Sequence, residues 1–194
     1  MSVLMRATEI EGRPVVTLAG EHVGDVKDVV FDSSKGKMLG FTLRSHRFFS
    51  APRKDVLAWS KVASLGRDAV MIRGEDALEE EALAEGGTPD NRNVLGNQVL
   101  TDTGTDLGKV TDVIIETGVT AEIVGYEVTA SEALATHGEH VLIPLPDTIA
   151  VSGEHLIVPA AALECVSHDL SGFGAAVQDF RAKLRRGSGE VQGS

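Results

Sequence analysis

The chain has 194 residues, of which 42% are hydrophobic and 24% charged, so it carries enough apolar residues to bury a core. Its single cysteine, Cys165, excludes an internal disulfide framework and a cysteine-rich zinc site. No apolar run reaches the roughly 18 residues that a membrane span needs, and the first six residues lack the features of a signal peptide. We therefore expect a soluble globular protein of the cytoplasm without a transmembrane segment.

The sequence repeats itself at an offset of 84 to 86 residues. The run VGDVKDVVF at 23–31 recurs as LGKVTDVII at 107–115, and GFTL at 40–43 recurs as GYEV at 125–128. Because several blocks recur in the same order, chance is a poor explanation. A period of this length indicates a duplicated domain rather than a short solenoid repeat.

Each copy has the pattern of a small β domain. Its apolar runs are short, often β-branched, and separated by turns that contain glycine, as strands of a small barrel or sandwich are. In the first copy the predicted strands cover 13–18, 26–32, 38–43, 55–59 and 69–73.

The second predicted strand changes phase along its length. Its apolar face slips between Val26 and Val29, and the same slip recurs from Val110 onward in the second copy. A β-bulge near Asp28 and Asp112 would absorb this slip and bend the strand, as a small barrel requires. We expect these two aspartates to cap backbone groups at the bulge rather than to form an acid–base pair.

The segment between the copies, residues 74–92, is acidic and rich in alanine and ends in Gly-Gly and Pro. This composition predicts a short solvated helix followed by a flexible hinge.

The C-terminal stretch predicts an amphipathic helix, because its apolar residues recur at spacings of four, three and four. These residues are Phe173, Val177, Phe180 and Leu184. The predicted fold is mainly β, with two tandem small barrels joined by an acidic linker. The expected boundaries are 1–75 for the first barrel, 76–92 for the linker, 93–169 for the second barrel, 170–186 for the helix and 187–194 for a disordered tail.

The formal net charge of −11 is divided unequally along the chain. Residues 1–73 carry 12 basic and 8 acidic residues, whereas residues 93–169 carry 12 acidic residues and one basic residue, Lys109. Surface charge governs association and partner choice more than fold. Either the oppositely charged copies attract and orient each other, or the first copy meets an anionic partner.

The basic residues gather in the segment 44–54, between the third and fourth predicted strands, where four permanent positive charges surround two adjacent phenylalanines. Three interpretations remain open: solvated charges around phenylalanines that pack inward, a protein-binding hot spot, or contacts with phosphates and bases. The matching stretch of the second copy is alanine-rich and acidic, so it cannot act in the same way. The candidate partner-binding residues are Arg44, His46, Arg47, Phe48, Phe49, Arg53 and Lys54.

No catalytic or metal-binding pattern stands out. Cys165 lies near His168 and Asp169, but no glycine-rich oxyanion turn flanks it, and a lone cysteine usually packs as a small hydrophobic residue. His137 and His140 lack an evident third metal ligand nearby. Nucleotide-binding glycine motifs are absent. We expect neither an enzyme nor a cofactor or metal.

The recurrent pattern resembles the PRC-barrel family. The resemblance lies in Gly12 and the stretches 23–32, 36–41 and 65–72, and in the matching second-copy stretches 108–115 and 123–126. It implies a small, highly curved β-barrel similar to the cytoplasmic domain of the photosynthetic reaction-centre H subunit. The fold of the family is also similar to the C-terminal domain of the small-subunit ribosome maturation factor, which is a docking module. The resemblance supplies no catalytic residues.

These observations predict a non-enzymatic protein-binding or scaffolding module in the bacterial cytoplasm. The alternative is an RNA- or ribosome-associated maturation or adaptor factor, whose binding would weaken steeply with salt. Sequence-specific reading of DNA is not expected. The partner and the oligomeric state stay open.

Overall fold

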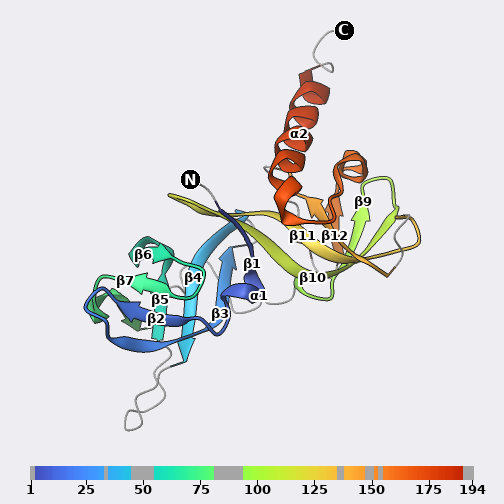
Figure 1. Ribbon diagram of the computed structural model, residues 1–194. Coiled ribbons are helices and arrows are strands. Elements are labelled where there is room, and N and C mark those ends of the chain that lie inside the picture. The colour runs from blue at the N-terminus through green and yellow to red at the C-terminus, as the bar shows by residue number, and fades with distance from the viewer. Residues whose placement is uncertain are drawn as a thin grey trace. The chain divides into compact units, whose positions relative to one another are not determined.

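The computed structural model divides the chain into two compact units, coloured by residue number in Figure 1. Unit 1 comprises Met1–Arg6, Ser33–Gly36 and Arg92–Ser194, and unit 2 comprises Ala7–Asp32 and Lys37–Asn91. The N-terminal residues thus belong to the unit that holds the second copy. The structure describes residues 3–32, 35–44, 55–80, 94–134, 138–146, 151–152 and 155–189.

The described residues of unit 2 form a sheet of seven strands in the order β8-β5-β4-β3-β2-β7-β6. Neighbours are antiparallel except β2 and β7, which are parallel. The elements are α1 (Ala7–Ile10), β2 (Pro14–Thr17), β3 (His22–Asp32), β4 (Lys37–Arg44), β5 (Asp55–Ala58), η1 (Trp59–Lys61), β6 (Val62–Leu65), β7 (Val70–Ile72), η2 (Glu75–Ala77) and β8 (Leu78–Glu80).

Unit 1 repeats this plan in the order β12-β11-β10-β9-β14-β13, with β1 also paired to β10. Its parallel pair is β9 and β14, which corresponds to β2 and β7. The elements are β1 (Val3–Arg6), β9 (Gln98–Thr101), β10 (Asp106–Thr117), β11 (Ala121–Ala130), β12 (His140–Pro144), β13 (Val151–Ser152), β14 (His155–Val158), η5 (Ala160–Cys165) and α2 (Leu170–Gly189).

The predicted β-bulges are confirmed in both copies. The register of β3 against β4 shifts between Val26 and Asp28, and the register of β10 against β11 shifts between Val110 and Asp112. The two shifts lie at equivalent positions. The sequence revealed them because one extra residue in a strand moves every following side chain to the other face.

The two bulge aspartates have different partners. Asp112 is buried, and its Oδ1 accepts a hydrogen bond of 2.8 Å from the backbone N–H of Val113, so the predicted capping role is confirmed there. Asp28 is half-buried, and its Oδ2 accepts a hydrogen bond of 2.9 Å from the Thr42 hydroxyl. Since threonine is replaced by glutamate at the equivalent position of β11, this cross-strand bond is particular to unit 2.

The start of the linker differs from the prediction. We expected a solvated helix from residue 74, but the described part forms the short 3-10 helix η2 and then strand β8. In β8, Leu78 pairs with Leu57 of β5, while Ala77 is buried just before it. The apolar pair therefore outweighs the helical tendency of the acidic, alanine-rich sequence. Residues 81–93 lie outside the described part.

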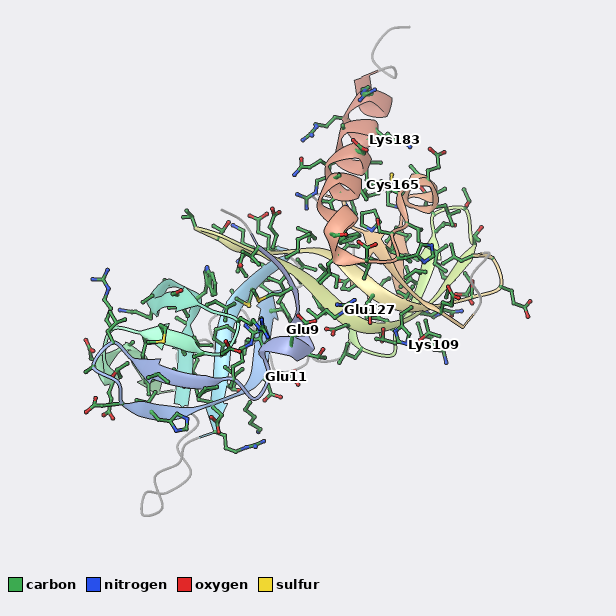
Figure 2. All side chains as sticks on the ribbon, in the orientation of Figure 1. Glu9, Glu11, Lys109, Glu127, Cys165 and Lys183 are labelled. Atoms are coloured by element: carbon green, nitrogen blue, oxygen red, sulfur yellow. The ribbon has the colours of Figure 1, made fainter. Side chains whose placement is uncertain are left out.

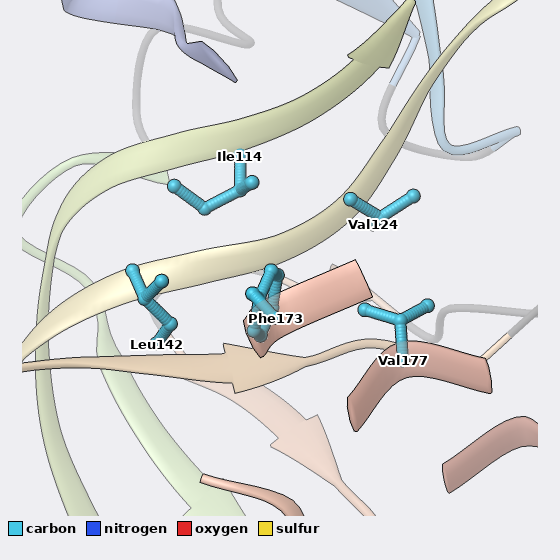
Figure 3. Packing of buried hydrophobic residues seen from close by; sticks show 5 residues of the cluster. All are labelled: Ile114, Val124, Leu142, Phe173 and Val177. Carbon is cyan, nitrogen blue, oxygen red and sulfur yellow. The ribbon is translucent and has the colours of Figure 1, made fainter. Parts of the chain in front are cut away.

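The predicted C-terminal helix is present as α2 and supplies part of the core of unit 1. Its Phe173 and Val177 pack on Ile114 of β10, Val124 of β11 and Leu142 of β12, as Figure 3 shows. The helix runs to Gly189, three residues beyond the predicted end at 186. Burial of the apolar stripe holds the first half of α2 on the sheet.

A glycine makes the contact between α2 and β11 possible. A Cβ built on Gly125 would collide with the ring of Phe173 and would lie 2.6 Å from the carbonyl oxygen of Ile143. The absence of a side chain therefore lets the aromatic ring rest directly on the strand. Leu4 of β1 packs against the same cluster, so the N-terminal strand and the C-terminal helix share one core.

Candidate functional site

Seven residues of the segment 44–54 were predicted to bind a partner, and the structure describes one of them. Arg44 is the last residue of β4, is exposed and lies opposite Asp25 of β3. The other six, from His46 to Lys54, lie outside the described residues, so their predicted role stays a prediction.

The described surface beside Arg44 carries further polar side chains, and we call His22, Asp25, Lys27 and Arg44 together the mixed-charge site. His22 Nε2 lies 3.0 Å from Asp25 Oδ1, and Lys27 Nζ lies 4.0 Å from a carboxylate oxygen of Asp28. The side chains of His22 and Lys27 are 45% and 51% exposed. Ion pairs this exposed contribute little stability.

Unit 1 has a notch at the equivalent place, where β11 ends beside the start of β10. The notch has a volume of about 800 Å³. One lining residue is Gly108, whose φ is +126° and whose Cβ would collide with the carbonyl oxygen of Thr129. We call this depression the acidic notch. It is lined by Gly96, Asp106, Gly108, Lys109, Val110, Thr111, Thr129, Ser131, Glu132 and Ala133.

Internal hydrogen bonds fix the walls of the acidic notch. The Ser131 hydroxyl donates to the carbonyl oxygen of Asp106 at 2.6 Å, and the backbone N–H of Gly108 donates to Asp106 Oδ1 at 2.9 Å. Glu132 is exposed at the rim. The notch is therefore a preformed depression with an acidic edge.

The mixed-charge site of unit 2 and the acidic notch of unit 1 occupy equivalent positions of the two copies but carry different residues. The internal repeat matches His22 with Asp106, Asp25 with Lys109, Lys27 with Thr111 and Arg44 with Thr129. Sequence reasoning found the unequal division of charge but did not compare these positions one by one. The 84- and 85-residue offsets, applied to single residues, show that Asp25 and Lys109 carry opposite charges and that Lys27 and Arg44 are replaced by threonine.

A polar cluster adjoins the acidic notch on β11. Both Nε and Nη2 of Arg6 lie 2.6 Å from Glu127 Oε2, and Nδ1 of His140 lies 3.2 Å from Glu127 Oε1. The Thr111 hydroxyl, which lines the notch, donates to the carbonyl oxygen of Glu127 at 3.2 Å. Figure 2 labels Glu127 and Lys109 on this side of unit 1. The cluster connects the notch wall to the N-terminal strand.

Cys165 is buried at the end of η5, and burial is the main cause that raises the pKa of its thiol, against the opposing charge of Lys183. Both residues are labelled in Figure 2. A thiol with a raised pKa holds little thiolate at neutral pH and is a poor nucleophile.

The described parts of the chain contain no group of three or more His, Cys, Asp or Glu side chains placed to hold a metal ion. Within the same residues no helix is both long enough and apolar enough to cross a membrane.

The duplicated sheet agrees with a comparison against protein families. The model of the PRC-barrel domain matches the chain twice, over residues 3–78 and 90–164. The chain belongs to the PRC-barrel family. It is a tandem PRC-barrel protein with one C-terminal helix, as the sequence pattern predicted. A search of curated proteins found no match.

Proposed function

We propose that this PRC-barrel protein is a non-enzymatic binding or scaffolding module of the cytoplasm that holds a protein partner through the segment 44–54. The observation that carries the proposal is the contrast between equivalent positions of the two copies. Where β4 of unit 2 ends in an exposed arginine and leads into a basic, aromatic sequence, β11 of unit 1 leads into Ser131, Glu132 and Ala133. The residues that differ after the common strand would carry the recognition.

The composition of the segment suits a protein contact. Arginine and aromatic side chains dominate the binding energy of protein interfaces, because they bury a large area and donate several hydrogen bonds. The segment holds Arg44, Arg47 and Arg53 around Phe48 and Phe49 and contains no acidic residue. The buried thiol of Cys165 supports the non-enzymatic part of the proposal.

The test is affinity capture from the native cell, followed by mass spectrometry of the captured proteins. The Arg47→Ala/Phe48→Ala variant should lose its partner, and the Arg67→Ala/Leu18→Ala variant should keep it. The control removes an arginine that is 94% exposed and a leucine that is 66% exposed, both in unit 2 and both outside the segment. Equal capture by the wild type and the first variant would refute the role of the segment.

A second candidate function is binding to RNA or a ribosome, which the net positive charge of residues 1–73 favours. Basic side chains that neutralise phosphates release counterions, so such binding would weaken steeply with salt. Direct titration with RNA at low and moderate salt separates the candidates. The absence of binding at low salt would remove this one.

A further inference from the structure

The proposed function leaves the acidic notch of unit 1, with its volume of about 800 Å³, without a role. Val110 and Ala133 contribute apolar surface to its lining. Asp106 and Glu132 contribute carboxylates, and the hydroxyl of Ser131 fixes the wall by its hydrogen bond to the carbonyl oxygen of Asp106. A depression that is already formed receives a side chain without reordering, which lowers the free-energy cost of binding.

The charge around the notch favours a cationic occupant. Besides the two acidic residues of the lining, Glu139 lies close by, since its carbonyl oxygen accepts a hydrogen bond of 2.8 Å from the backbone N–H of Ala130. The opposing charge in the lining is that of Lys109, the one basic residue in 93–169, where 12 residues are acidic. An excess of one sign at a depression raises the local concentration of groups of the opposite sign. Nucleic acid and anionic lipid are therefore poor occupants.

Two apolar side chains continue from the notch across the sheet. Asp106 of β10 lies opposite Leu100 of β9, and Leu100 lies opposite Ile157 of β14. Paired residues of neighbouring strands share a face of the sheet, so the three side chains form one row. Ile157 is 40% exposed, and Leu100 is half-buried. We call Leu100 and Ile157 the apolar pair.

The spacing of this row fits an extended peptide. Neighbouring strands lie about 5 Å apart, so the apolar pair covers a stretch from about 5 to about 10 Å beyond Asp106. In an extended chain, side chains two positions apart point to the same face and are about 7 Å apart. A lysine or arginine packs its methylene stem on apolar surface and extends its charged head, as a notch with apolar lining and an acidic edge requires.

We propose that the acidic notch and the apolar pair together dock an extended segment of a partner protein, in which a lysine or arginine stands two positions from a large apolar residue. The cationic head pairs with Asp106 and Glu132, and the apolar side chain covers the apolar pair. This inference goes beyond the proposed function, because it places a second protein contact in unit 1 and does not involve the segment 44–54.

Titration of the ¹⁵N-labelled full chain with a short peptide, followed by NMR, tests the proposal and suits weak binding. The peptide has the sequence Gly-Ser-Arg-Ser-Leu-Ser-Gly. The backbone amide signals of Gly108 and Ala133 in the notch should shift, whereas that of Gly20 in unit 2 should not. No shift of the notch signals at about 5 mM peptide, which detects a Kd of about 1 mM, would overturn the proposal.

Two altered peptides separate the contributions of charge and apolar contact. Replacing the arginine by glutamate, or the leucine by serine, should each weaken binding about tenfold. Raising the salt concentration from about 25 mM to about 300 mM should weaken binding of the original peptide, because salt screens the charges. If either altered peptide binds as tightly as the original, the proposed docking is wrong.

Two variants of the protein identify the surfaces. Glu132→Lys and Ile157→Ser should each weaken peptide binding about tenfold. Glu116→Lys is the matched control for charge, since it lies at the opposite end of β10, and Val119→Ser is the control for the apolar change, since Val119 is 101% exposed between β10 and β11. Both controls should bind like the wild type. Circular dichroism shows that each variant is folded, and unchanged binding by a folded Glu132→Lys or Ile157→Ser variant would refute the docking.

The outcomes separate this inference from the proposed function. The Arg47→Ala/Phe48→Ala variant should bind the peptide like the wild type. If the segment 44–54 captures a partner but the peptide does not bind, this inference fails alone. If the peptide binds but capture does not depend on the segment, the proposed function fails alone. Spermidine that shifts the notch signals as strongly as the peptide at equal concentration would assign the notch to small cations and overturn docking of a protein segment.

Discussion

Arg6 and Glu127 are 121 positions apart in the sequence and lie in contact, with two nitrogen atoms of the guanidinium each 2.6 Å from one carboxylate oxygen. The Glu127 side chain is 13% exposed and that of Arg6 is 28% exposed. Arg6 belongs to β1, whose strand is paired with β10, while Glu127 lies on β11. The ion pair therefore spans β10 and fastens the N-terminal strand to the sheet of unit 1.

Removal of this ion pair should destabilise unit 1. Arg6→Ala leaves the largely buried carboxylate of Glu127 without its guanidinium partner. We therefore expect a loss of about 1–3 kcal/mol in the free energy of unfolding. Urea unfolding at neutral pH measures it. Arg67→Ala is the control, because that arginine is 94% exposed, and its substitution should change little. Equal effects of the two substitutions would show that β1 is not fastened in this way.

Tyr126 is 1% exposed, and its hydroxyl has no hydrogen-bond partner among the described residues. The equivalent residue of unit 2 is Phe41, which is fully buried. Burying a hydroxyl without a hydrogen bond costs free energy, so Tyr126→Phe should leave the stability unchanged or raise it by about 1–2 kcal/mol.

The reciprocal substitution supplies the control. Phe41→Tyr places a hydroxyl in the core of unit 2 and should lower the free energy of unfolding by about 1–3 kcal/mol. Thermal unfolding of both variants shows directly whether each substitution raises or lowers the stability relative to the wild type. A clear loss of stability in Tyr126→Phe would mean that the hydroxyl has a partner in solution, such as a buried water.

Burial raises the pKa of Tyr126 to about 12, because the charged phenolate is poorly solvated in the core. The unfolded chain ionises its tyrosine near pH 10, so a rising pH stabilises the unfolded state before it stabilises the folded state. This contribution to stability is therefore fully present below about pH 10 and is lost as the pH rises toward 12.

The sequence contains one tyrosine, so the near-ultraviolet absorbance of tyrosinate reports Tyr126 alone. A spectrophotometric titration should give a midpoint near 12 in the folded protein and near 10 in a strong denaturant. Coincident midpoints in a sample that circular dichroism shows to be folded would contradict the burial of this side chain.

Gly125→Ala should disturb the packing of α2 on the sheet of unit 1. The added methyl group would meet the Phe173 ring and the Ile143 carbonyl, and overpacking of this kind costs about 1–3 kcal/mol. Hydrogen exchange of the α2 amides should accelerate as the helix loosens. Gly172→Ala provides the comparison, because a Cβ there meets nothing within 4 Å and alanine favours the helix. It should slow the same exchange or leave it unchanged.

Asp112→Ala should cost more stability than Asp28→Ala. The first substitution leaves the buried N–H of Val113 without its acceptor at the bulge and should cost about 1–3 kcal/mol. Asp28 is half-buried, so water can replace its carboxylate more easily. Chemical denaturation of the two variants under the same conditions compares them. The reverse order would exclude a capping role for Asp112.

The repeat, the bulges and the helical stripe were predictable because each leaves a periodic trace in the sequence. A bulge reverses the phase of alternation, as between Val26 and Val29, and a packed helix spaces its apolar residues like Phe173 and Val177. Strand β6 was not predicted, since its four residues show no clear alternation. Strand β8 was missed because pairing with β5 overrides an acidic, helix-like composition.

The candidate site was predicted less completely than the fold. The excess of basic residues near Arg44 was visible in the sequence, and so was the acidity of the second copy. The acidic notch could not be predicted, because it depends on the close approach of Gly108 to Thr129 and on a hydrogen bond from Ser131 to Asp106. The contact between Arg6 and Glu127 depends on β1 and β11 both pairing with β10. A local sequence pattern cannot predict such a long-range arrangement.

The position of β1 has a consequence for how the protein is made and handled. During synthesis Val3–Arg6 leave the ribosome long before β10 has been made, although β10 is the strand with which they pair. The earliest synthesised strand of unit 1 must therefore wait for β10 before it can pair. A cut between the two family matches would separate β1 from the strand with which it pairs, so a fragment that begins at the second match would lack one strand of unit 1.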